Sequence, residues 1–116
     1  MTKIEVKNII QHLGEKEAEG SRLGTPVLDL SVPAFVALVD HGKAVVPHLV
    51  SMLQTAASRQ AAWIVAALRL INDPSAEHPL REACARVNSI EISDEWDYAL
   101  RGECYLALKQ FGTGIQ

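Results

Sequence analysis

The chain has 116 residues, a formal net charge of −3, and a composition that is 48% hydrophobic but only 5% aromatic. This length allows one domain with a single core, spanning residues 1–116. An acidic balance argues against nucleic acid as the partner, because binding to phosphates needs clustered Lys and Arg. The sequence shows no signal-peptide pattern and no apolar run of about 20 residues, so we expect no membrane span and a cytoplasmic location.

The first predicted helix begins after Thr2 and ends at Gly14. Thr2 and Glu5 form a capping-box pattern, which is typical of a helix N-terminus. Its apolar face repeats at helical spacing and comprises Val6, Ile9, Ile10 and Leu13. Residues 15–30 then mix charged residues with two glycines and a proline. We predict a long loop there, with its last apolar residues returning to the core.

Two helices are predicted between this loop and residue 54. Ser31 is the expected N-cap of the first, and Gly42 is its expected C′ glycine. The second helix follows at once, over residues 43–54. The expected apolar faces are Val32, Phe35, Val36 and Val39 in the first, and Val46, Leu49, Val50 and Leu53 in the second.

Residues 58–73 carry the strongest pattern in the chain. One helical face, at spacing i, i+3, i+4 and i+7, comprises Ala61, Ile64, Val65 and Leu68. The opposite side is also apolar and comprises Trp63, Ala66, Ala67 and Leu70. A helix that is apolar nearly all round is a buried one, so we expect this segment to be the central helix of the fold. Asp73, before Pro74, is expected to end it.

Two further helices complete the prediction. Ser75 is the expected cap of the fifth helix, and Ser93, followed by acidic residues, is expected to begin a sixth that runs to Gly112. The expected inner faces are Leu80, Ala83, Cys84 and Val87 in the fifth, and Trp96, Ala99, Leu100, Cys104, Ala107, Leu108 and Phe111 in the sixth. Cys84 and Cys104 therefore indicate buried, reduced thiols, with a disulfide or redox role as the alternative.

The helices also resemble one another in sequence. AVVPHLVSML at 44–53 and AEHPLREACA at 76–85 place a proline at the same position, 32 residues apart. AALRLIND at 66–73 and LALKQFGT at 106–113 share a pattern of apolar residues and a cation, 40 residues apart. A period of about 30 to 45 residues with two helices per unit is typical of an α-solenoid.

The segments GKAVVPHLVSMLQ, SRQAAWIVAALRLIND and AEHPLREACARV resemble a HEAT-like, armadillo-type helical repeat array. The resemblance covers residues 31–112 and implies an all-α fold, with about six helices stacked as antiparallel pairs in a short solenoid. It further implies a curved helical surface that binds another protein. We therefore predict a small interaction module that acts as an adaptor, an inhibitor, or an immunity- or antitoxin-type neutraliser. The alternative is a helical repeat that handles a ligand or nucleic acid, related to the HEAT folds of lyases and glycosylases.

The sequence lacks the spacings expected of a catalytic or metal site. Its four histidines include no HExxH pair, and its two cysteines do not form a CxxC motif. The chain also lacks the GxSxG turn that carries the nucleophilic serine of α/β-hydrolases. We therefore predict no enzyme activity, no cofactor and no metal.

The candidate binding residues lie around the start of the last predicted helix. Between residues 87 and 104, five acidic residues accompany a single base. Aromatic anchors within a charged rim are common in protein interfaces, so we predict a surface for a basic partner protein. It comprises Glu91, Asp94, Glu95, Trp96, Asp97, Tyr98 and Arg101. The alternative is that Trp96 belongs to the core and the acidic residues only cap and solubilise the helix.

A third hypothesis concerns self-association. A helical stack this short leaves the flank of its last helix, including Tyr105 and Leu106, without a covering neighbour. Homo-oligomers formed end to end would cover that flank.

Overall fold

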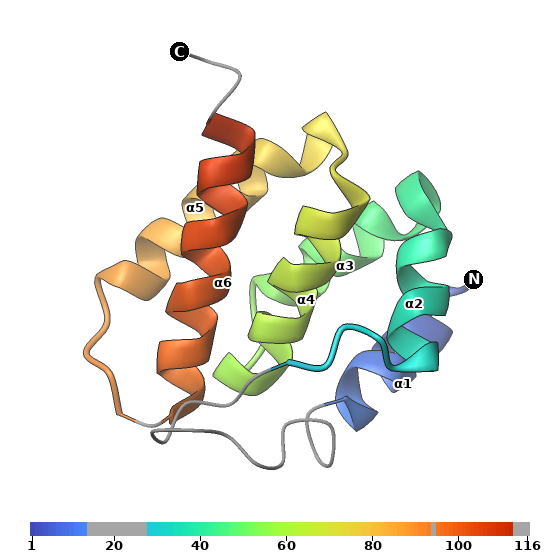
Figure 1. Cartoon of the computed structure of the whole chain (residues 1–116), viewed down its shortest axis with the longest axis horizontal. Coiled ribbons are helices and arrows are strands. Elements are labelled where there is room, and N and C mark those ends of the chain that lie inside the picture. The colour runs from blue at the N-terminus through green and yellow to red at the C-terminus, as the bar shows by residue number, and fades with distance from the viewer. Residues whose placement is uncertain (14–27, 94, 113–116) are drawn as a thin grey trace.

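Six α-helices make up most of the described chain in this computed structural model, which describes residues 1–13, 28–93 and 95–112 (Figure 1). They are α1 (Lys3–His12), α2 (Pro33–Asp40), α3 (Val46–Leu53), α4 (Ser58–Ile71), α5 (Glu77–Asn88) and α6 (Glu95–Gly112). Two short 3₁₀ helices, η1 (Gly42–Val45) and η2 (Pro74–Ala76), lead into α3 and α5. Over the described ranges there is no strand, so the prediction of an all-α fold is confirmed.

Helix α4 lies at the centre of the core. Every residue from 61 to 68 is buried, as the all-round apolar pattern predicted. Trp63 on α4 meets Phe35 of α2 edge to face, with ring centroids 5.3 Å apart. Leu70 is an exception to the predicted apolar surface, since 41% of it is exposed near the end of the helix.

Most helices contact several others. Helix α4 contacts α1, α2, α3 and α6, and α3 also contacts α1 and α5. Helix α1 contacts α2 as well, and α5 contacts α6. Figure 1 shows α6 in front of α5, with α4 beside it toward the middle of the molecule. Tyr98, Tyr105 and Leu106 of α6 are exposed, so part of this helix has no covering neighbour among the described elements.

Several predicted helix ends are confirmed. The capping box of α1 is present, with Glu5 N donating to Thr2 Oγ1 at 3.2 Å and Thr2 N donating to Glu5 Oε1 at 3.1 Å. Gly42 follows α2 with a left-handed φ of 58°, which glycine adopts without the strain of a Cβ. Helix α4 ends at Asn72, whose φ of 56° is also left-handed. Asn tolerates this conformation better than most residues do.

Two predicted caps are wrong. Helix α2 begins at Pro33 after Val32, which makes no side-chain cap, while the Ser31 hydroxyl donates to Asp29 Oδ1 at 2.6 Å. Ser75 also does not cap α5, because its backbone N–H donates to Asp73 Oδ1 at 2.9 Å in η2. In both places an Asp two residues earlier bonds locally and forms a turn that precedes the helix.

The predicted inner face of α2 is also partly wrong. Phe35 and Leu38 are its buried residues, whereas Val36 is 41% exposed and Val39 is only partly buried. The predicted third helix begins with the η1 turn instead of a full α-helical turn. Most of the predicted 15–30 loop lies outside the described residues, and Leu28 and Leu30 pack against the core as expected.

Candidate functional site

A pocket of about 200 Å³ opens where the C-terminal end of α5 meets the N-terminal ends of α4 and α6. Its buried apolar wall comprises Leu53, Ala61, Ala83 and Leu100. Its polar residues are Gln54, Ser58, Arg86, Glu91, Asp97 and Arg101. Because Arg86, Ile90 and Glu91 are exposed, they form the outer rim, and we call this feature the α5–α6 pocket.

Asp97 is committed to bonds within the chain. Its Oδ2 accepts from the Ser93 backbone N–H at 2.8 Å and from the Ser93 hydroxyl at 3.0 Å, and its Oδ1 accepts from the Ser58 hydroxyl. An acid in the first turn also complements the positive end of the helix dipole. Asp97 thus ties the start of α6 to the start of α4, on one wall of the pocket.

Arg101 has a similar structural task. Its Nη2 donates to the backbone carbonyl of Ile90, and lies 3.5 Å from that of Val87. These carbonyls lie at and just beyond the C-terminal end of α5, where the helix dipole favours a cation. Arg101 therefore fastens the α5–α6 turn against α6.

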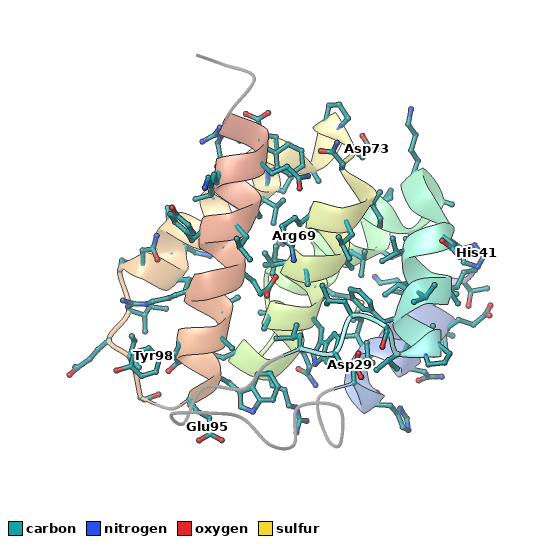
Figure 2. The ribbon with its side chains drawn as sticks, in the orientation of Figure 1. Asp29, His41, Arg69, Asp73, Glu95 and Tyr98 are labelled. Carbon is teal, nitrogen blue, oxygen red and sulfur yellow. The ribbon has the colours of Figure 1, made fainter. Side chains whose placement is uncertain are left out.

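Three other predicted residues remain on the surface. Glu91 and Glu95 are exposed, and 56% of Tyr98 is exposed. Figure 2 shows Tyr98 and Glu95 at the same end of α6, with both side chains directed away from the helical stack. Asp94 lies outside the described residues.

Trp96 is neither a pocket residue, like Asp97 and Arg101, nor an exposed one, like Glu95 and Tyr98. It is partly buried and packs against the core, and it lines a second, more open hollow with Asp97, Arg59 and Gln60. The structure thus places Glu91, Asp97 and Arg101 at the α5–α6 pocket, and Glu95 and Tyr98 on the outer face of α6. The described members of the predicted set are therefore divided among the α5–α6 pocket, the second hollow and the outer face of α6.

Ile90 and Arg86 are rim residues that the sequence analysis missed. Ile90 is 63% exposed in the turn after α5, beside Glu91. A large apolar residue between the inner face of the fifth predicted helix and the start of the sixth at Ser93 was a signal that could have singled it out. Arg86 gave no such signal, because a cation in the last turn of a helix is common.

A half-buried ion pair joins α4 to α6 away from the pocket. Arg69 Nη2 lies 3.3 Å from Glu103 Oε1, and Figure 2 shows Arg69 between these two helices. Burial raises the pKa of Glu103, and the attraction and hydrogen bond of Arg69 oppose this without reversing it. Gln110 adds a second link, donating to the Arg69 carbonyl at 2.7 Å.

The two thiols meet between α5 and α6. Cys84 and Cys104 are free and buried, which confirms their predicted placement. The neighbouring thiol of Cys84, together with burial, raises the pKa of Cys104. Such a thiol stays protonated near neutral pH and is a poor nucleophile.

Within residues 1–13, 28–93 and 95–112, no three His, Cys, Asp or Glu side chains are grouped so that they could hold a metal ion. The helices described in those ranges also include none with the length and apolar content needed to cross a membrane. Comparison with protein-family models, curated proteins and solved structures gives no match.

Proposed function

We propose that this chain is a small protein-binding module that works without catalysis, and that the α5–α6 pocket receives a basic segment of its partner. In this role it acts as an adaptor or as an inhibitor that covers the partner's surface. We place it in the cytoplasm, where buried thiols such as Cys84 and Cys104 stay reduced.

The arrangement of the helices supports a HEAT-like stack as the scaffold. A short solenoid of three helical hairpins requires contacts within each hairpin and along each row. The contacts of α4 with α2 and α6, and of α3 with α1 and α5, agree with that requirement. Such a scaffold presents turns and helix ends as binding surfaces.

One observation carries the proposed site: a large exposed apolar residue stands beside an exposed acid at the rim of a pocket with an apolar wall. Ile90 and Glu91 are those two residues, and Leu53 and Leu100 belong to the wall. A Lys or Arg side chain suits this combination, because its aliphatic stem can lie on apolar surface while its cation meets a carboxylate.

The test substitutes two exposed residues of the pocket rim and no residue of the core. Wild-type protein and the double variant Ile90→Asn, Glu91→Lys are immobilised, and proteins captured from an extract of the source organism are quantified by mass spectrometry. We expect a basic protein to be retained by the wild type and lost with the double variant. The loss should be larger at low salt, because rim charges act mainly through screened, long-range attraction.

Asp40→Lys is the matched control. Asp40 is an exposed acid at the end of α2 and does not line the α5–α6 pocket, so this variant has the same change of charge at a different place. The control should retain the same protein as the wild type. The proposal is overturned if no captured protein depends on residues 90 and 91, or if the control loses the same protein.

A further inference from the structure

The outer face of α6 carries several large apolar residues. The described chain has seven large hydrophobic residues that are substantially exposed, and three of them lie on α6. They are Tyr98 at 56%, Tyr105 at 64% and Leu106 at 43%. Tyr98 and Tyr105 are seven residues apart, which places them on the same side of the helix, two turns from each other.

A glycine lies at the centre of this face. Gly102 is exposed within α6, where a glycine lowers stability by roughly 0.5–1 kcal/mol relative to an alanine. A Cβ built on Gly102 meets no atom within 4 Å, so packing within the described chain does not require a glycine there. Glycine lets another backbone approach closely, and here that backbone would have to come from outside the described helices.

Opposite charges stand at equal distances from Gly102. Glu95 lies seven residues before it and Lys109 seven residues after it, and both are exposed. Seven residues correspond to about 10 Å along a helix. Neither side chain forms an ion pair with another described residue, while the Lys109 ammonium lies 6.0 Å from the Tyr105 ring centroid. The face therefore carries an acid at one end and a base at the other.

We infer that this face binds a second copy of the chain, with the two α6 helices antiparallel and crossing at Gly102. In that arrangement Glu95 meets Lys109 of the second copy, and Tyr98 meets Tyr105 of the second copy. Both pairs occur twice, because a two-fold axis makes the interface self-complementary. The interface closes with two subunits, unlike the end-to-end assembly considered from the sequence. The inferred dimer goes beyond the proposed function and leaves the α5–α6 pocket free.

The charged pairs make the inference testable. Sedimentation equilibrium over a range of chain concentrations should show a reversible monomer–dimer equilibrium for the wild type. Glu95→Lys and Lys109→Glu each turn two attractive pairs into two repulsive ones, and each should weaken the dimer by about tenfold. An equimolar mixture of the two variants should dimerise again, because each contact between positions 95 and 109 then joins a lysine of one variant to a glutamate of the other.

Gly102→Arg supplies a second, steric test. Arg is a better helix former than Gly and its side chain would point into open space, so the monomer should keep its helical content and melting temperature. The dimer should be lost. The double variant at Ile90 and Glu91 should dimerise like the wild type, which separates this surface from the proposed binding pocket.

Two results would overturn the inference. One is a wild type that sediments as a monomer at every concentration. The other is dimerisation that is unchanged in Gly102→Arg, or that is not restored by mixing the charge variants. In those cases the outer face of α6 does not pair with itself across Gly102.

Discussion

At the scale of single residues, carboxylates that look alike in the sequence have different tasks around the start of α6. Asp97 accepts hydrogen bonds from Ser93 and from Ser58, whereas Glu91 is exposed at the pocket rim. Ser58 precedes Asp97 by 39 residues, so no local pattern could have revealed that bond. The sequence predicted an acidic region, and only the fold distinguishes a structural acid from one that is available to a partner.

Stability measurements can separate these tasks. We expect Asp97→Ala to lower the free energy of unfolding by about 2 kcal/mol, because it removes several hydrogen bonds to a charged group. Glu91→Ala should change it by less than about 0.5 kcal/mol, as is usual for an exposed residue. Urea unfolding followed by circular dichroism measures both values. Equal effects of the two substitutions would contradict the structural role of Asp97.

Glu103 should make stability depend on pH. Its pKa in the folded chain is raised above the ordinary value of 4.5, chiefly by burial. The folded chain therefore holds this proton more readily than the unfolded chain. The resulting stabilisation is fully present below the ordinary pKa and is lost as the pH rises through the raised one.

Glu103→Gln removes this titration. The unfolding free energy of the wild type, minus that of the variant, should fall as the pH rises from about 4.5 and should level off above the raised pKa. Urea unfolding at a series of pH values gives this difference. A difference that stays constant or increases with pH would show that burial does not dominate at Glu103.

At the scale of elements, apolar periodicity predicted the helices well where one pattern dominated. Helix α4 is buried at every position from 61 to 68, and the capping box of α1 is formed as its spacing indicated. Prediction failed where local side-chain bonds compete with helix caps. Asp29 and Asp73 bond to residues two positions later, and this displaces the helix starts expected at Ser31 and Ser75.

Because α4 is central to the core, substitutions of two leucines on that helix should lower the free energy of unfolding by very different amounts. Leu68 is fully buried, while 41% of Leu70 is exposed. Leu68→Asp buries an unpaired charge and should lower the free energy of unfolding by at least about 4 kcal/mol, enough to unfold a domain of ordinary stability. Leu70→Asp is the matched control and should cost about 1 kcal/mol or less. A cooperative thermal transition retained by Leu68→Asp would contradict the central position of α4.

At the scale of the whole molecule, one core joins all six helices, but the helices contribute unequally to it. Eight consecutive residues of α4 are buried, whereas α1 buries only Val6 and Ile10. Local opening requires less free energy where fewer apolar contacts are broken. We therefore expect a stable centre and a less stable first helix.

Hydrogen exchange should reveal this gradient. We expect the amides of α4 to exchange slowest, close to the rate set by global unfolding, and those of α1 to exchange much faster. Mass spectrometry of peptides from α1 and α4 compares the two rates under the same conditions. Exchange of α1 as slow as that of α4 would indicate a uniformly cooperative fold.

The candidate site was less predictable than the fold. The acidic composition of residues 91–97 identified the region, but the residues chosen there divide between a pocket and a helix face. The division depends on where α4 and α5 meet α6, which is a property of tertiary packing. The binding role of these residues remains a prediction.

The edge-to-face contact of Trp63 with Phe35 has an optical consequence. Trp63 is fully buried and its Nε1 has no hydrogen-bond acceptor among the described residues, so its fluorescence should lie at short wavelength and resist quenching by acrylamide. Trp96, which lines an open hollow, should emit at longer wavelength and be quenched readily. The chain thus carries two intrinsic reporters. A ligand seated near the start of α6 would change the emission of Trp96, while that of Trp63 would serve as an internal standard.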